Sequence, residues 1–207
     1  MNIPSQFVSE AADRLIETNP NAKKAFLEII DAILQNHSVG STEFVINSST
    51  KNCNGVVPIK ESIYERLETH YLWFREKPLR YFENAQKGGP IDVYKEFGSP
   101  TDSFNVGLEF ETGNISSAHR SMNKLCVGIK HGDLHMAFLI MPIKKLAYYL
   151  TDRVSNYEEL APYFDLLNDY PIVVFGFDAD GYSPTAPLLE KGRDGMSKRN
   201  IRKWQNY

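Results

Sequence analysis

Residues 90–113, PIDVYKEFGSPTDSFNVGLEFETG, decide the fold class. Residues 90–97 (PIDVYKEF) and 104–111 (FNVGLEFE) are rich in β-branched, aromatic and other apolar side chains, which is typical of strands. Residues 98–102 (GSPTD) between them have the composition of a turn. The stretch therefore predicts two neighbouring strands that can pair as a hairpin.

Three carboxylates fall within this stretch. Glu109 and Glu111 are two residues apart, so on a strand both side chains project to one face, while Phe110 between them faces the opposite layer and supplies core. If the strands pair, Asp92 lies beside Glu109 and the three carboxylates converge. Converging carboxylates need a compensating cation, and hard oxygen ligands suit Mg²⁺ or Mn²⁺ and phosphoryl chemistry. The alternative is that Glu109 and Glu111 line the solvent face of an edge strand while Asp92 caps a turn.

Strands and helices alternate outside the hairpin. Apolar residues at helical spacing predict two helices near the N-terminus, with Asn19 capping the second, and further helices downstream. The expected helices cover residues 9–35, 59–75, 117–128 and 143–150. Further strands are expected at residues 135–141 and 171–177, with a short strand or loop in the polar segment 41–50. This order indicates an α/β domain of three layers.

Composition places the chain among globular proteins. It has 207 residues, 42% apolar and 24% charged, and a formal net charge of −3, so we expect one domain over residues 1–207. No cysteine pair has metal-ligand spacing, and no signal peptide or membrane-spanning run is found, which predicts a cytoplasmic protein without a membrane partner. Residues 191–207 carry six Lys/Arg against one acid, a basic tail that is either a phosphate contact or simply solvated.

The spacing of Asp92 and the Glu-x-Glu resembles the signature of PD-(D/E)XK nucleases, with Glu in the place usually held by Lys. In more detail, the chain resembles the BamHI, BglII and BstYI group of type II restriction endonucleases, and BstYI most closely. The matching pieces are IDVYK, FNVGLEFETGN, HRSMNKL, HMAFLIMPIKKL and SNYEEL. The resemblance implies a mixed central β-sheet sandwiched by helices, with an N-terminal helical dimerisation region (1–57), a catalytic core (58–177) and a basic C-terminal tail (178–207).

The resemblance assigns metal and catalytic roles to residues of the hairpin. Asp92 and Glu109 correspond to the metal-binding pair, and Phe110 is included with them among the metal-binding residues. Glu111 takes the third motif position. A Glu cannot act on phosphate as an ammonium does, so Glu111 would position or deprotonate water, or bind a second ion. The implied cofactor is Mg²⁺, with Mn²⁺ as a substitute.

A fourth catalytic carboxylate is implied upstream. Residues 65–77 (ERLETHYLWFREK) resemble the helix that carries it in these enzymes, although Tyr-Leu stands where Gly is expected. Glu76 would then steady a metal through water. Glu68 and Glu83 are the alternatives, and an exposed helix Glu without a role is a third reading.

Two segments are similar to the parts of these enzymes that read DNA. Amide, hydroxyl and guanidinium groups in them suit base edges and phosphates. The candidates in the strand-to-helix junction after the Glu-x-Glu are Asn114, Ser116, Ser117, His119 and Arg120. The candidates in the downstream loop are Arg153, Ser155 and Asn156. The alternative in both segments is helix capping, by Ser116 or Ser117 and by Ser155 or Asn156.

The function implied by the resemblance is Mg²⁺-dependent hydrolysis of double-stranded DNA, leaving 5′-phosphate ends. The enzyme would act as a homodimer on a palindrome of six base pairs, with GATC as its expected core, and would share that site with a cognate DNA methyltransferase that need not bind it. One alternative is a structure-specific repair or recombination nuclease of the same fold. The other is a catalytically silent DNA-binding relative.

Overall fold

The computed structural model describes residues 1–38, 40–80, 89–99 and 101–191. Its centre is a six-stranded mixed sheet with strand order β1-β7-β6-β5-β4-β3. Strands β5, β6 and β7 run parallel to one another, whereas β1, β3 and β4 are antiparallel to their neighbours. The strands are β1 (Asn2–Val8), β3 (Phe74–Lys77), β4 (Ile91–Ser99), β5 (Asp102–Phe110), β6 (Met136–Pro142) and β7 (Ile172–Asp178).

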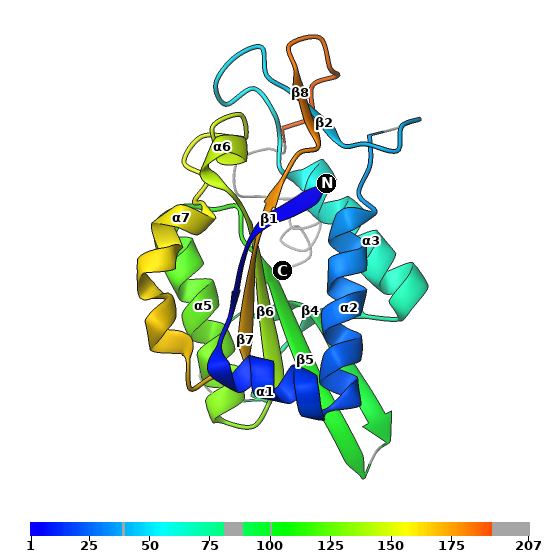
Figure 1. Ribbon diagram of the computed structural model, residues 1–207, viewed down its shortest axis with the longest axis vertical. Coiled ribbons are helices and arrows are strands. Elements are labelled where there is room, and N and C mark those ends of the chain that lie inside the picture. The colour runs from blue at the N-terminus through cyan, green and yellow to red at the C-terminus, as the bar shows by residue number, and fades with distance from the viewer. Residues whose placement is uncertain (39, 81–88, 100, 192–207) are drawn as a thin grey trace, which may run out of the picture.

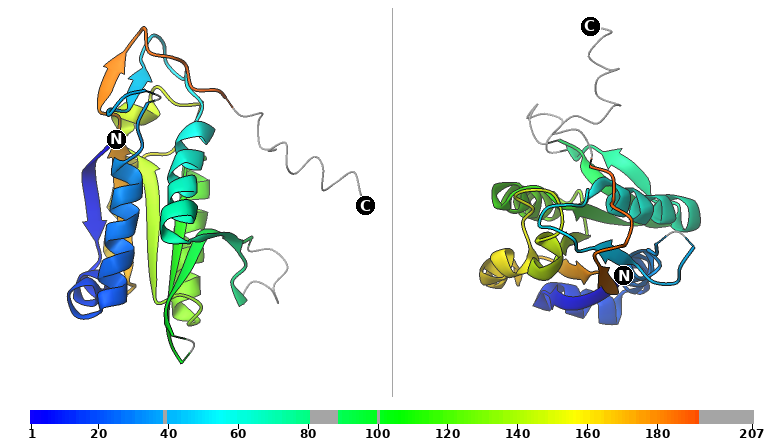
Figure 2. Two further views of the ribbon diagram at one scale, coloured as in Figure 1. Left: turned by 90° about the vertical axis from the view of Figure 1, so that its right-hand side faces the viewer. Right: turned by 90° about the horizontal axis from the view of Figure 1, so that it is seen from above.

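Helices cover both faces of this sheet (Figures 1 and 2). One face packs against α1 (Glu10–Thr18), α2 (Pro20–Leu34) and α3 (Val57–Tyr71). The other packs against α5 (Ile115–Lys130), α7 (Tyr157–Leu160) and the 3₁₀ helix η1 (Ala161–Leu167). The short helix α6 (Lys144–Ala147) and a parallel pair, β2 (Val45–Asn47) with β8 (Gly181–Ser183), complete the fold. The predicted α/β class, a mixed sheet sandwiched by helices, is confirmed.

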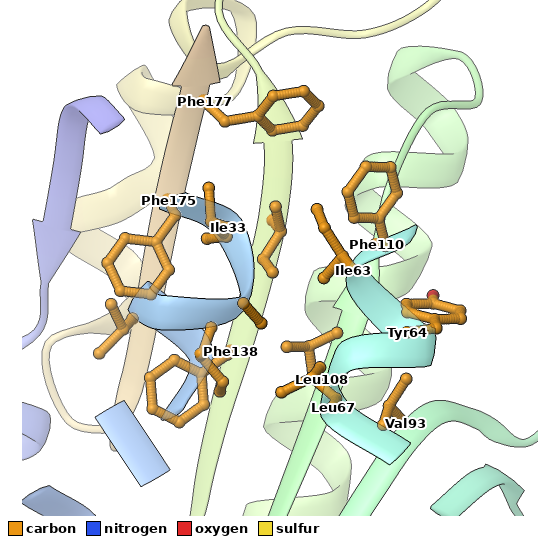
Figure 3. Packing of buried hydrophobic residues seen from close by; sticks show 14 of the residues in the cluster. Ile33, Ile63, Tyr64, Leu67, Val93, Leu108, Phe110, Phe138, Phe175 and Phe177 are labelled. Atoms are coloured by element: carbon orange, nitrogen blue, oxygen red, sulfur yellow. The ribbon is translucent and has the colours of Figure 1, made fainter. Parts of the chain in front are cut away.

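The central strands are apolar throughout because both of their faces are covered. Every residue of β6 and β7 is buried. Phe138, Phe175 and Phe177 point toward the side of α2 and α3 (Figure 3), whereas Leu139 and Val174 belong to the cluster beneath α5. This continuous core fixes β5 in the sheet, and β5 carries the predicted Glu-x-Glu.

The N-terminal helix pair forms as predicted. Asn19 separates α1 from α2, and its side chain accepts hydrogen bonds from the backbone N–H groups of Asn21 and Ala22 at 2.8 and 3.3 Å. Pro20 occupies the first helical turn, where its missing N–H costs nothing. In the described residues, no helix is both long and apolar enough to cross a membrane.

The helix predicted for residues 59–75 is wrong at its end. Helix α3 finishes at Tyr71, Leu72 takes a left-handed conformation (φ 59°), and the chain continues into β3. The cause is tertiary: Trp73 is buried, and its Nε1 donates to Glu28 Oε2 at 2.8 Å. Helical spacing cannot reveal this contact with a distant helix. Strands β1, β3 and β8 were not predicted, and the helix expected at 143–150 shrinks to α6.

Candidate active site

Asp92 and Glu109, called the acidic pair below, lie where β4 begins and β5 ends. Pairing of Val93 with Leu108 puts Asp92 next to Glu109 across the two strands. The Asp92 N–H donates to Glu109 Oε1 at 3.2 Å, and the Phe110 N–H donates to Asp92 Oδ2 at 3.1 Å. The predicted hairpin and the predicted contact between these two residues are therefore confirmed.

Tyr64 of α3 fixes Asp92 from one face of the sheet. Its hydroxyl donates to Asp92 Oδ2 at 2.7 Å, and its ring packs edge-to-face on Phe110 at 6.3 Å between centroids (Figure 3). Burial and the neighbouring Asp92 charge raise the pKa of Tyr64 well above its ordinary value. Tyr64 is thus a neutral hydrogen-bond donor. Phe110 contributes its side chain to the core, as predicted.

The carboxyl of Glu109 has a raised pKa. Its residue is only 4% exposed, and burial, followed by repulsion from Asp92, raises the pKa of its carboxyl to about 7. Lys124 of α5 opposes this shift, with Nζ 2.7 Å from Glu109 Oε1. Two adjacent carboxylates in a place of low water access form a site that gains stability from a bound cation.

Glu111 is buried close by but is held separately. Its Oε1 accepts a hydrogen bond from the Gly113 N–H at 2.5 Å, and its Oε2 accepts one from Ser121 Oγ at 2.8 Å. A Cβ at position 113 would lie 2.8 Å from Glu111 Oε1, so a larger residue there would push the Glu111 carboxylate out of its present place. Glu109 and Glu111 both contact α5, so the prediction that they share a face is confirmed, and the alternative of a solvent-facing edge strand is wrong.

The predicted convergence of three carboxylates is corrected by this arrangement. In residues 1–38, 40–80, 89–99 and 101–191, no three His, Cys, Asp or Glu side chains are placed to hold one metal ion together. The structure has instead the acidic pair plus a third carboxylate, Glu111, whose oxygens are both engaged by hydrogen-bond donors. Those donors hold the Glu111 carboxylate against Gly113 and Ser121.

Glu76 lies on a strand, β3, and not on the expected helix. The pairings of Arg75 with Val93 and of Lys77 with Ile91 bracket Glu76, so it occupies the position on β3 that matches Asp92 on β4. Its backbone is left-handed (φ 56°) and the residue is exposed. Three acidic residues therefore occupy matching positions on three neighbouring strands.

Glu68 and Glu83 are the two alternatives to Glu76 as the fourth catalytic carboxylate. Glu68 lies on α3 and pairs with Arg75 at 2.7 Å. Glu83 lies outside the described residues, as does the basic segment 192–207. The structure therefore places Glu76 in line with the acidic pair and gives Glu68 a different partner.

The first predicted DNA-reading segment forms the beginning of α5. Asn114 caps this helix, since its side chain accepts the Ser117 N–H at 3.0 Å. Capping by Ser116 or Ser117 is therefore wrong. Ser116 and Arg120 are exposed, and His119 packs edge-to-face on Tyr163 at 4.5 Å between centroids.

The second segment lies directly beside the first. The Ser155 N–H donates to the Gly113 carbonyl at 2.7 Å. Asn156 is buried and caps α7 by accepting the Glu159 N–H at 3.2 Å, which agrees with the capping alternative. Arg153 is exposed, with a left-handed backbone (φ 63°). The two segments thus form one surface next to Glu111.

Sequence reasoning missed Tyr64, Ser121 and Lys124, which contact the three hairpin carboxylates. Ser121 and Lys124 are three residues apart, so they lie on one side of a helix. That spacing is visible in the sequence, but which side of α5 faces β5 depends on the packing of the whole layer. Tyr64 gives no such signal, because its partner is 28 residues away.

Comparisons with known proteins show which family the chain belongs to. The profile of the family "Restriction endonuclease BamHI" matches residues 1–196. The chain is 51% identical to the type II restriction enzyme BamHI of Bacillus amyloliquefaciens over 208 aligned positions, covering 100% of this chain and 98% of that enzyme. It is 37% identical to the type II restriction enzyme OkrAI of Oceanobacter kriegii, over 77% of this chain and 81% of that enzyme.

The fold also matches a solved structure, that of restriction endonuclease BglII complexed with a DNA 16-mer. The TM-score is 0.63 at 15% sequence identity, covering 87% of this chain and 79% of that one. The sheet and its helical layers thus have the fold of a restriction endonuclease, and the family match and the 51% identity define a nuclease of that class. The chain belongs to the BamHI family and is a type II restriction endonuclease, a site-specific deoxyribonuclease. The predicted group is confirmed, and the closer likeness to BstYI stays a prediction.

The raised pKa of Glu109 gives a pH dependence that can be measured without metal. A carboxyl that titrates near 4.5 when unfolded and near 7 when folded holds its proton longer in the native state, so its contribution to stability is full below about pH 4.5 and is lost as pH rises through about 7. We expect the free energy of unfolding of the wild type, relative to Glu109→Gln, to fall by about 2–3 kcal/mol across that window. Urea unfolding in EDTA measures this difference, and parallel profiles for the two proteins contradict it.

Proposed function

We propose that this enzyme cuts both strands of double-stranded DNA at a palindromic site, as a homodimer, with Mg²⁺ bound at the acidic pair. Mn²⁺ would substitute for Mg²⁺. The observation that carries the proposal is the contact between Asp92, where β4 begins, and Glu109, where β5 ends. BglII, which shares the fold, is complexed with DNA in its solved structure.

The donor set of the acidic pair fits a divalent ion. Carboxylate oxygens are the ligands that Mg²⁺ and Mn²⁺ prefer. Among the described residues, none donates a hydrogen bond to Asp92 Oδ1 or to Glu109 Oε2, so each carboxylate has an oxygen available. Phe110, which the resemblance adds to the metal-binding residues, follows Glu109 in the chain and donates its backbone N–H to Asp92. When bound, such an ion lowers the pKa of a water and neutralises charge on the phosphate.

The residues around the pair orient the reacting groups. Tyr64 keeps Asp92 Oδ2 in place, and Ser121 with Gly113 keeps the Glu111 carboxylate in place. Glu111 would accept a proton from the attacking water at a carboxylate oxygen. The water oxygen would then form a bond to phosphorus as the bond to the 3′ oxygen breaks, and the 3′ oxygen would take a proton from a second water, leaving a 5′-phosphate and a 3′-hydroxyl. Glu76 would act at the edge of this site, from the matching position on β3.

The surface formed by the α5 N-terminus and the loop before α7 would read the DNA. Arg120 and Arg153 are exposed there and suit phosphate or guanine, and Asn114 and Ser116 suit base edges. The Ser155–Gly113 hydrogen bond would keep the two reading segments in register with Glu111. A homodimer would present this surface twice, which matches a palindrome of six base pairs. A cognate methyltransferase would recognise the same site and need not bind the enzyme.

Replacing Glu109 by Ala tests the metal assignment. Cleavage of a mixed-sequence plasmid should fall at least about 10³-fold, because loss of a ligand removes several kcal/mol of transition-state stabilisation, while DNA binding measured with Ca²⁺ is retained. Glu96→Ala, which removes an exposed carboxylate of the same hairpin, is the control and should cut normally. Normal cutting by Glu109→Ala refutes the assignment.

The pattern of the wild-type digest tests the kind of cleavage. Discrete bands support sequence-specific cleavage, a smear supports the structure-specific alternative, and an intact plasmid supports the silent relative.

Substitutions at Glu111 test its separate role. Glu111→Ala should lose about 10²-fold or more in kcat, as expected for removal of a proton acceptor, with little change in DNA affinity. Glu111→Gln keeps the acceptor oxygen but not the basicity, and Glu111→Lys supplies the charge found in other nucleases of this fold. Single-turnover cleavage rates measure all three. Full activity of Glu111→Ala would mean that this carboxylate has no part in the reaction.

A further inference from the structure

Lys124 connects the two strand ends that form the acidic pair. From α5, its Nζ lies 2.7 Å from Glu109 Oε1 at the end of β5 and donates to the carbonyl of Pro90, just before β4, at 2.8 Å. The side chain of Lys124 is only 13% exposed and that of Glu109 only 5%. An ammonium and a carboxylate with so little water contact depend on each other for compensation.

The local charge is not balanced by this contact alone. Asp92 and Glu109 carry two negative charges when both are ionised, and in the described part of the chain Lys124 is the one cation within 4 Å of either carboxylate. Tyr64, the other side chain in contact with the pair, is a neutral donor. One positive charge therefore faces two negative ones. The ammonium of Lys124 contacts an oxygen of Glu109, which is a proposed metal ligand.

A second buried lysine offers a close comparison. Lys95, on β4, contacts Glu28 of α2 at 2.8 Å, with side-chain exposures of 13% and 6%. The two pairs match in burial and in distance. They differ because Glu28 is a single carboxylate that also accepts the Trp73 N–H, whereas Glu109 has Asp92 beside it. Of these two lysine contacts, only the one made by Lys124 leaves a neighbouring negative charge, that of Asp92, without compensation.

We propose that Lys124 is a built-in counter-ion of the acidic pair. Its ammonium holds Asp92 and Glu109 together before a divalent ion binds, and it gives up its contact with Glu109 when that ion binds. The inference rests on the proposed metal site and assigns Lys124 a positioning role. A divalent ion brings two charges to the place where the ammonium supplies one, and the ion and the ammonium compete for the same Glu109 carboxylate. Lys124 thus stabilises the protein without metal and weakens the binding of metal.

The test compares Lys124→Met with Lys95→Met at pH 8, using Ca²⁺ as the probe. In EDTA, both variants should melt at a lower temperature than the wild type, because each leaves a buried carboxylate unpaired. Saturating Ca²⁺ should return the melting temperature of Lys124→Met to that of the wild type with Ca²⁺, and should leave the deficit of Lys95→Met in place. Calorimetric titration should show Ca²⁺ binding about tenfold tighter to Lys124→Met than to the wild type.

Further variants keep the test decisive. Lys124→Arg retains the charge and should keep the wild-type melting temperature and Ca²⁺ affinity. In a Glu109→Gln background, Lys124→Met should no longer lower the melting temperature in EDTA, since the partner charge is already gone. If Lys124→Met alone does not fold, its folding together with Glu109→Gln supports the counter-ion role, and failure of the double variant to fold overturns it.

The outcomes separate this inference from the proposed function. If Ca²⁺ binds the wild type but binds Lys124→Met with equal or weaker affinity, or rescues both lysine variants alike, the counter-ion role is overturned while the metal site stands. If Ca²⁺ binds neither the wild type nor Lys124→Met, the metal site itself is refuted and the inference is refuted with it.

Discussion

The side chains of the half-buried Asp92 and the buried Glu109 lie next to each other, and the repulsion between their charges is the constraint that the groups around them must meet. Burial and this repulsion together raise the pKa of Glu109 to about 7. Two neighbouring side chains stabilise the pair: Tyr64 donates a hydrogen bond to Asp92, and Lys124 places a positive charge beside Glu109. We expect a site built this way to be stable without metal and to favour a divalent cation.

Pairing of β4 with β5 produces this contact, and two helical layers support it at one end of the sheet. Helix α3 reaches Asp92 from one face, and α5 reaches Glu109 and Glu111 from the other. Strand β5 pairs with β6, and β6 and β7 are buried along their whole length, so close packing anchors the strand that carries Glu109. The same α5 begins at Asn114, so the helix that holds the carboxylates also starts the surface proposed to read DNA.

The sequence allowed the hairpin, the shared face of Glu109 and Glu111 and the contact of Asp92 with Glu109 to be predicted, because strand alternation and turn composition are local signals. It did not allow the end of α3 to be predicted, because the burial of Trp73 against Glu28 is a contact between distant segments. For the same reason Glu76 was expected on a helix. The separate clamping of Glu111 by Gly113 and Ser121 also depends on tertiary packing.

Crystals of the enzyme soaked with Mn²⁺ test the central claim most directly, since anomalous scattering locates the ion without reference to activity. The account predicts an anomalous peak between Asp92 and Glu109, at about 2.0–2.3 Å from a carboxylate oxygen of each. Mn²⁺ bound elsewhere with both carboxylates outside its coordination sphere, or no peak at saturating Mn²⁺, would contradict it.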